Sequence, residues 1–199
     1  MKTSIIVNTC ALGPRARSVT GSTTPTPHAM RAYALQHFIL PSYASWADEV
    51  IVAGEWRPGA DYLYLHVPSV YFSCVDALAQ RQAGAEVATG DLLVFVHDDH
   101  FFAPWSINEL GCDDADIWVP ERWRQEPGGE ALLNNGTFDG YIGGHCVVMR
   151  DWVAKAAKWS DVAKIHTWDV DFTQRAQAAG ARILWNPYGV DVFDVEVAT

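Results

Sequence analysis

Positive charge and cysteine are both scarce in this sequence. Lys and Arg number 14 against 24 Asp and Glu, which gives a formal net charge of −10. A chain of that charge repels phosphate at long range, so the composition argues against a general role in binding nucleic acid or anionic membranes. The 4 cysteines are far apart and form no Cys-x-x-Cys pair. We therefore expect neither a disulfide framework nor a zinc knuckle, and we expect free thiols in a reducing compartment.

Long apolar runs and internal repeats are absent as well. No stretch approaches the roughly 18 apolar residues that a membrane helix needs, and the opening run MKTSIIVNTC is too short for a secretory signal. We expect a cytoplasmic chain without a membrane span. The 199 residues, of which 49% are hydrophobic, are suited to a single domain over 1–199 with a substantial core.

Apolar runs alternate along the chain with helical patterns. The least core-like part is 10–27, rich in Gly, Pro, Ser and Thr, which we expect to form a flexible loop. A helix is predicted to begin at Thr26, and Pro41 to bend or end it. Strands are predicted at 4–9, 49–54, 62–67, 92–96, 115–119, 141–149 and 182–185, and further helices at 73–88 and 168–179. This alternation predicts an α/β fold with a mostly parallel, Rossmann-like sheet flanked by helices on both faces.

A cluster of acids and imidazoles follows the predicted strand 92–96 directly, in the order His97, Asp98, Asp99 and His100. In an open α/β sheet, ligands bind beyond the carboxyl ends of the strands. Adjacent carboxylates favour a bridging cation, and carboxylate oxygens suit Mg²⁺ or Mn²⁺, which could hold a diphosphate. The alternative is a polar turn that merely ends a buried strand, and these four residues alone do not separate the two.

The wider pattern from Asp76 to Asp99 includes Arg81 and the pair Gly90-Asp91. It resembles the core of family 2 glycosyltransferases of the GT-A fold. The resemblance implies that Asp99 binds the metal, with His97 as a further ligand in place of the family's first acid and Asp98 beside it on the donor side. It also implies that Arg81 contacts the phosphates of the donor. Arg15, Arg17 and Arg31, in or beside the predicted loop, are weaker candidates for that contact.

Two later stretches extend the resemblance. Residues 139–150 look like the family's glycine-containing strand, in which the backbone of Gly143 and Gly144 passes close to the donor sugar; a β-bulge or tight bend would use the same glycines. Residues 168–187 are similar to the family's segment that carries the general base. The resemblance implies that Asp169 is this base, with Asp171 as the fallback. Acids at the start of a helix also simply favour its dipole.

The remaining site residues are assigned by the same resemblance. Thr9, at the end of the first strand, and Glu55, after the second, match the nucleotide-binding half, where an acid contacts the base. Asp191 stands where the family has a late metal ligand, commonly His, with Asp194 as the alternative. Candidate acceptor-binding residues are Trp105, Trp123 and Trp168, although most tryptophans in a domain belong to the core. The stretch 121–136 is expected to be an exposed loop, either a lid over the acceptor or plain solvated chain.

The sequence therefore predicts a glycosyltransferase that depends on Mn²⁺ or Mg²⁺. It would move a sugar from a nucleotide-diphosphate sugar of the UDP or GDP type to a hydroxyl acceptor, with inversion. The acceptor is not identified; the net charge disfavours nucleic acid but does not exclude a modified DNA base. The alternatives are a non-catalytic nucleotide- or sugar-binding module of the same fold, and a sugar nucleotidyltransferase.

Overall fold

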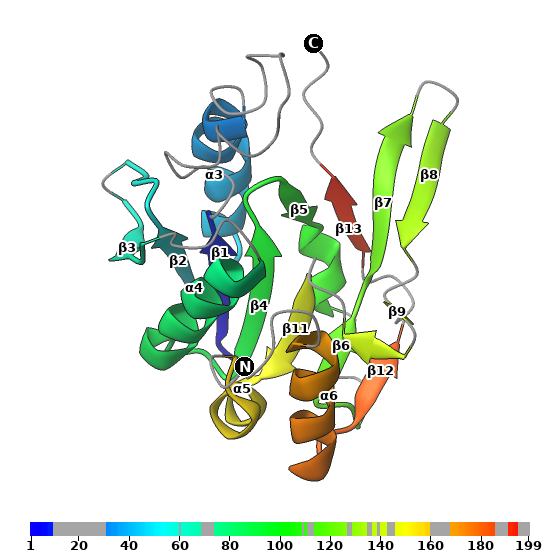
Figure 1. Ribbon diagram of the computed structural model, residues 1–199. Coiled ribbons are helices and arrows are strands. Elements are labelled where there is room, and N and C mark those ends of the chain that lie inside the picture. The colour runs from blue at the N-terminus through cyan, green and yellow to red at the C-terminus, as the bar shows by residue number, and fades with distance from the viewer. Residues whose placement is uncertain are drawn as a thin grey trace.

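The structure is a computed structural model of the 199-residue chain (Figure 1). It describes residues 1–9, 31–59, 61–68, 74–108, 110, 114–126, 129–134, 137–138, 140–142, 146–159, 168–185 and 191–194. The predicted loop 10–27 lies outside these residues, as do Gly143 and Gly144. The backbone of Trp168 and Asp191 is described, but their side chains are not.

A central sheet of seven strands organises the molecule, in the order β12-β6-β11-β4-β1-β2-β3. The strands are β1 (Thr3–Asn8), β2 (Glu49–Gly54), β3 (Leu63–His66), β4 (Leu92–His97), β6 (Ile117–Val119), β11 (Val147–Arg150) and β12 (Ile183–Trp185). All neighbouring pairs are parallel except those that β11 makes with β4 and β6. The predicted α/β class and mostly parallel sheet are confirmed.

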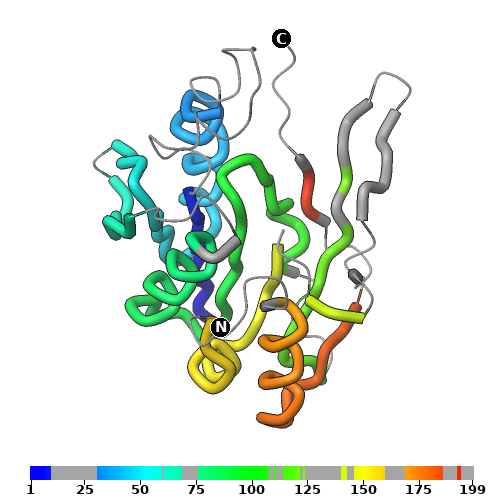
Figure 2. Tube along the Cα trace, viewed as in Figure 1, coloured from blue at the N-terminus to red at the C-terminus, as the bar shows by residue number. Residues whose placement is uncertain are grey.

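Both faces of the sheet are buried, because successive apolar residues of each strand point to opposite sides. On one face, Ile5 and Val7 pack with the helical segment 31–44. On the other, Ile6 packs with the helices α4 (Cys74–Val87), α5 (Asp151–Ala157) and α6 (Trp168–Ala178). Figure 2 shows these three helices side by side along that face. No helix within the described ranges is long and apolar enough to cross a membrane.

The first helix continues past Pro41, so the proline does not end it; that it bends the helix stays a prediction. Leu35–Ile39 form a π-helical turn, in which the N–H of Leu40 donates to the carbonyl of Leu35, and α3 (Leu40–Ala44) follows with Pro41 in its first turn. Pro41 has no N–H to donate and its ring crowds the preceding turn. The wider π turn precedes the proline directly, and it is the kind of local adjustment that lets a helix continue through such a residue.

The predicted strand 141–149 is two strands in two sheets. Tyr141–Ile142 (β10) pair with Thr137–Phe138 (β9), whereas Val147–Arg150 (β11) lie between β4 and β6 in the central sheet. The apolar run is therefore shared between two environments. The prediction continued through Gly143-Gly144-His145, which separate the apolar residues of the two strands in the sequence.

A second sheet of four strands adjoins the end of β4, in the order β5-β13-β7-β8. Its strands are β5 (His100–Phe102), β13 (Asp191–Asp194), β7 (Glu121–Glu126) and β8 (Gly129–Asn134), and a 3₁₀ turn (Pro104–Asn108) follows β5. The stretch 121–136, predicted to be a loop, thus contains the hairpin β7–β8. Charged residues on β7 removed the apolar alternation by which a strand is recognised.

The amino ends of β1, β2 and β4 are joined by one carboxylate. Glu49 accepts hydrogen bonds from the Ser4 hydroxyl at 2.6 Å and from the Thr89 N–H at 2.9 Å. The Gly90 N–H donates to Ser4 Oγ at 2.9 Å, and a Cβ on Gly90 would lie 2.6 Å from that oxygen. Partial burial would raise the pKa of Glu49, but these hydrogen bonds and the charge of Lys2 lower it below its usual value.

Candidate functional site

The site begins where the strand order reverses. From β1 the chain continues to β2 and β3 on one side, and α4 then returns it to β4 on the other side of β1. The carboxyl ends of β1 and β4 are therefore adjacent at a topological switch point, the usual ligand position in such sheets. Asn8 and His97 are paired in register there, and Asn8 Nδ2 lies 3.2 Å from His97 Nδ1, within hydrogen-bond distance.

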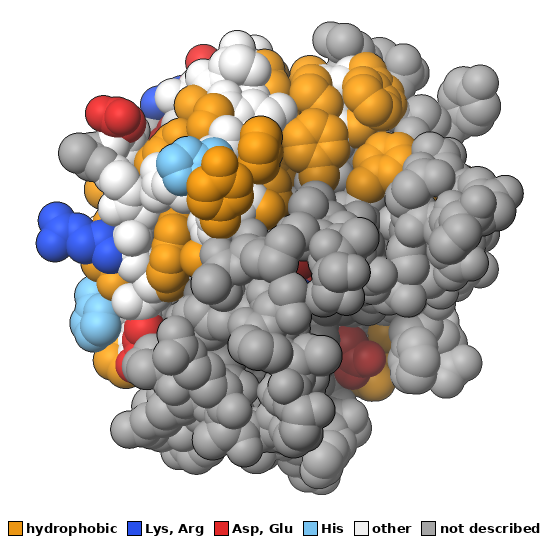
Figure 3. Space-filling view, turned by 90° about the horizontal axis from the view of Figure 1, so that it is seen from above, with side chains coloured by type: hydrophobic (Ala, Val, Ile, Leu, Met, Phe, Trp, Pro, Cys, Tyr) orange, Lys and Arg blue, Asp and Glu red, His pale blue; other side chains and the backbone are white. Residues whose placement is uncertain are grey.

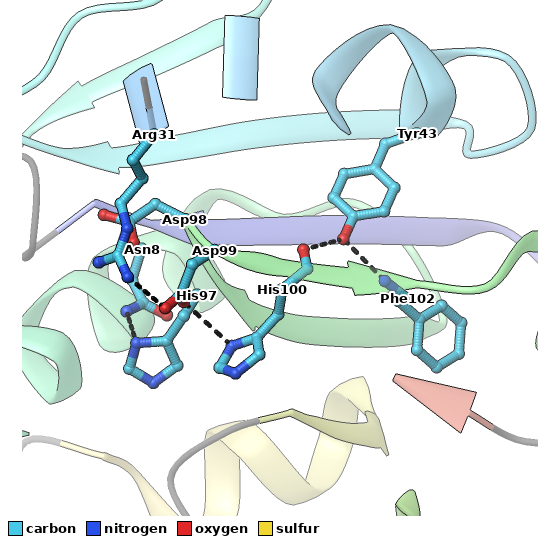
Figure 4. A network of polar contacts seen from close by, with 8 residues as sticks. All are labelled: Asn8, Arg31, Tyr43, His97, Asp98, Asp99, His100 and Phe102. Carbon is cyan, nitrogen blue, oxygen red and sulfur yellow. Dashed lines mark hydrogen bonds and ion pairs between the residues drawn. The ribbon is translucent and has the colours of Figure 1, made fainter. Parts of the chain in front are cut away.

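Arg31 forms ion pairs with both acids of the turn between β4 and β5 (Figure 4). Its guanidinium donates to Asp98 Oδ1 at 3.3 Å and makes a closer hydrogen bond to Asp99 Oδ2. Asp98 is buried, with 1% of its side chain exposed, whereas Asp99 keeps 25% and Arg31 29%. His100 Nδ1 lies 3.5 Å from the other oxygen of Asp99. Asp99 is thus the carboxylate of this pair that a ligand can reach.

A buried tyrosine holds the strand that follows this turn. The hydroxyl of Tyr43 donates to the carbonyl of His100 at 2.9 Å and accepts from the N–H of Phe102 at 3.0 Å (Figure 4). Burial raises the pKa of Tyr43, so the hydroxyl stays protonated and keeps both bonds. The turn at 98–99 is therefore fixed from Arg31 on one side and from Tyr43 on the other.

The donor set at this turn suits a hard cation that also binds phosphate. Mg²⁺ is typically held by one or two carboxylates together with waters and substrate phosphates, not by a complete protein cage. In keeping with that, no group of three His, Cys, Asp or Glu within the described ranges is placed to hold an ion. The backbone of β13 adds a detail: Asp194 is paired with His100, and Asp191 with Glu121. Of these two acids, Asp194 is the one whose backbone adjoins the turn.

The residues predicted to bind the nucleotide meet at the ends of β1 and β2. Thr9 is buried, and its hydroxyl donates to the carbonyl of Ala53 at 3.2 Å. Gly54 has a φ of +146°, and a Cβ there would lie 2.1 Å from Thr9 Oγ1, so this close approach requires glycine. Glu55 follows directly, and its Oε2 is buried without a hydrogen-bond donor among the described residues. Thr9 therefore has a structural partner, while one buried oxygen of Glu55 accepts no hydrogen bond from a described residue.

No family model and no curated protein matches this chain. Among solved structures, it is similar to the catalytic domain of Drosophila β1,4-galactosyltransferase 7 in complex with xylobiose, with a TM-score of 0.53, 13% identity, and coverage of 96% of this chain and 66% of that one. It is also similar to residues 1–349 of S. aureus TarS in complex with UDP-GlcNAc, with a TM-score of 0.52, 11% identity, and coverage of 100% of this chain and 60% of that one. A197 from STIV is similar with a TM-score of 0.51, 12% identity, and coverage of 99% of this chain and 87% of that one.

The chain has a GT-A-like fold. At these identities the likeness concerns the fold alone. The chain spans less than two thirds of the length of both the galactosyltransferase domain and the TarS segment.

Arg81 lies inside this GT-A-like fold. Only 1% of it is exposed, and its guanidinium lies 5.0 Å from the ring centre of Trp159, which is itself stacked on Phe172. Its charge also opposes the effect of burial, which raises the pKa of the Cys146 thiol. Arg81 thus packs within the layer of α4, α5 and α6, and its predicted contact with phosphate stays a prediction.

The two acids predicted as general base lie in the first turn of α6. Because α6 leads through a short connection into β12, which is parallel to β6, this turn lies at the carboxyl edge of the sheet. Asp171 forms an ion pair with Arg175 at 3.1 Å and is 42% exposed. Asp169 makes no ion pair with a described residue; its Oδ1 accepts the Val170 N–H at 2.9 Å. Of the two carboxylates, Asp169 is therefore the one that no described basic side chain pairs with.

Aromatic residues gather on the second sheet beside the turn. Trp105 is 53% exposed and lies edge-on to Phe193, with ring centres 6.3 Å apart. Phe193 is also the register partner of Trp123 on β7. Seen from the carboxyl edge of the sheet, the described surface shows many hydrophobic side chains and few Lys or Arg (Figure 3). The structure thus places Trp105, in the 3₁₀ turn, against Phe193 of β13, whose register partner on β7 is Trp123.

Sequence reasoning missed Asn8, Tyr43 and Phe193. Asn8 carried a signal, since it is a polar residue that ends an otherwise apolar buried strand. Tyr43 carried none, because its role depends on a packing contact with β5, 57 residues away. Phe193 was missed because β13 was not predicted as a strand.

Proposed function

We propose that this chain is a metal-dependent glycosyltransferase that moves a sugar from a nucleotide-diphosphate sugar to a hydroxyl acceptor, with inversion. The observation that carries the proposal is the acidic turn at 97–100, which lies at the switch point of a GT-A-like sheet. The likeness to TarS, which is known in complex with UDP-GlcNAc, supports a nucleotide-sugar donor.

In this proposal each residue has a role that follows from its position. Asp99 is the reachable carboxylate and holds Mn²⁺ or Mg²⁺, with His97 and Asp98 beside it. The cation would neutralise the charge that grows on the departing diphosphate. The third protein ligand, if there is one, is better assigned to Asp194 than to Asp191, because Asp194 is the residue paired with His100. Glu55 accepts an N–H from the nucleotide base through its available oxygen.

The transfer itself needs a base and an acceptor platform. Asp169 takes the proton of the acceptor hydroxyl as that oxygen bonds to the anomeric carbon and the bond to the nucleoside diphosphate breaks. Gly143 and Gly144 remain candidates for the backbone beside the donor sugar. The exposed face of Trp105, with Trp123 and Trp168, is the candidate surface for an acceptor ring.

Thermal shift with UDP and GDP, with and without Mn²⁺, tests the donor site. A bound diphosphate at a hundredfold excess over its dissociation constant stabilises the wild type by about 2.7 kcal/mol. We expect Asp99→Ala to lose the part of this shift that depends on Mn²⁺. Asp114→Ala removes an exposed acid whose carboxylate pairs with Arg182, and we expect it to keep the whole shift.

Product analysis then separates the three candidate functions. A glycosyltransferase hydrolyses its donor sugar slowly even without acceptor. A binding module binds the donor without turnover, and a nucleotidyltransferase releases pyrophosphate from a nucleoside triphosphate and a sugar phosphate. If the melting temperature of the wild type does not change with nucleotide, the proposed glycosyltransferase function is excluded.

A further inference from the structure

The acidic turn already contains a cation, the guanidinium of Arg31. It reaches both carboxylates of the turn, Asp98 and Asp99, from the helical segment that follows 10–30 (Figure 4). Arg31 is 29% exposed, so it lies against the turn but can still move toward solvent. A planar guanidinium bonded to two neighbouring carboxylates is an ordered, charge-assisted arrangement.

A divalent cation on Asp99 would compete with this arrangement for the same carboxylate. The guanidinium hydrogen-bonds one oxygen of Asp99, and His100 Nδ1 lies 3.5 Å from the other. An ion bound to the same carboxylate would place a second positive charge against Arg31, where the two repel strongly in a partly buried site. We therefore expect each cation to weaken the binding of the other to this carboxylate.

We propose that Arg31 is the resident cation of the acidic turn, that a divalent ion displaces it from Asp99, and that the released guanidinium then binds the diphosphate of the donor. The inference rests on the proposed function. It gives Arg31 two successive anionic partners, a carboxylate before the donor arrives and a phosphate afterwards. Arg31 gives one N–H to each of the two carboxylates, and the oxygens of a diphosphate can accept the same charge-assisted hydrogen bonds. A cation shared by Asp99 and the donor brings the phosphates beside the side chain that has just been displaced.

The test compares two binding constants in the same variants. Arg31→Gln removes the positive charge. Arg31→Lys keeps the charge but lacks the paired N–H groups of the guanidinium. Arg182→Gln is the matched control, since it also removes one arginine from ion pairs with two acids, Asp114 and Asp116, at another place. Calorimetry measures the Kd of Mn²⁺ alone, and then the Kd of UDP or GDP at saturating Mn²⁺. The folding of each variant is checked by its melting temperature.

The expected signature is a pair of changes with opposite sign. In Arg31→Gln, Mn²⁺ alone binds about tenfold more tightly, because its competitor is gone, while the nucleoside diphosphate binds about tenfold more weakly. Arg31→Lys lies between Arg31→Gln and the wild type in both constants, and Arg182→Gln stays within about twofold of the wild type.

Other results overturn the proposal. They also distinguish its failure from a failure of the proposed function. Weaker or unchanged Mn²⁺ binding in Arg31→Gln makes Arg31 a structural support of the acids. An unchanged nucleotide Kd removes its contact with phosphate. If nucleotide binds but Mn²⁺ binds to none of the proteins, both the displacement and the metal dependence fail while the donor site stands. If the wild type and Arg31→Gln bind neither, the proposed function itself fails.

Discussion

Two carboxylates in one helical turn, Asp169 and Asp171, differ in what they are bonded to, and this decides which can act as a base. Asp171 shares its charge with Arg175, whereas Asp169 has no ion pair with a described residue. We expect Asp169→Ala to lower the hydrolysis of the donor sugar, with water as acceptor, by about 10²- to 10⁴-fold. Its nucleotide Kd should stay within about twofold of the wild type.

The matched control is Asp171→Ala, which removes the acid two residues further along the same helical turn and breaks an exposed ion pair of small energy. Its rate should fall by no more than a few-fold. Undiminished hydrolysis in Asp169→Ala, or an equal loss in both variants, would remove the assignment of the base to Asp169.

The residues of the site were predictable to the extent that they are contiguous in the sequence. His97, Asp98 and Asp99 follow an apolar run directly, so their place at a strand end could be deduced from the sequence alone. Arg31 was only a weak candidate, because it comes from an element 67 residues away from Asp98. Which carboxylate it would reach depends on how the first helix packs, and no local pattern encodes that.

At the scale of the element, one buried hydroxyl, that of Tyr43, ties β5 to the first helical segment, in addition to the pairing of β5 with β13. Tyr43→Phe leaves the carbonyl of His100 and the N–H of Phe102 without this partner in a buried place, which costs about 1–3 kcal/mol. For a chain of this size we expect the melting temperature to fall by about 2–10 °C. Tyr33→Phe, which removes an equivalent hydroxyl from an exposed ring, should leave it unchanged. Equal melting temperatures for the two variants would show that the hydroxyl of Tyr43 does not fix β5.

Helices and strands were predictable where a continuous sequence pattern lies in a single structural environment, such as a strand buried on both faces. The strands β1, β2 and β4 are buried on both faces and read as short apolar runs, and α4 and α6 end near the expected glycines. The hairpin β7–β8 and the strand β13 were not predicted, because their pairing with one another, and that of β13 with β5, supplies the stability that their own sequence does not show. The seven-residue helix α5 is too short to give a clear period.

At the scale of the whole molecule, the net charge of −10 makes stability depend on where the acids have partners. Glu49 is the described acid whose pKa is lowered by hydrogen bonds from Ser4 and Thr89. A carboxyl whose folded pKa lies below its unfolded value stabilises the fold above that unfolded value, here 4.5. The stabilisation is then lost as the pH falls through the folded pKa.

We therefore expect Glu49→Gln to unfold at lower denaturant concentration than the wild type at pH 7, with the difference narrowing as the pH falls below about 4.5. Urea denaturation between pH 3 and pH 7 measures this directly. Glu86→Gln is the control, because it removes the same charge from an exposed position on α4. A difference that stays constant over the whole pH range would mean that Glu49 acts through the shape of its side chain and not through its charge. In that case the contacts of Glu49 with Ser4 and Thr89 would stabilise the fold by packing. The dependence of stability on acid pH would then come from other carboxylates.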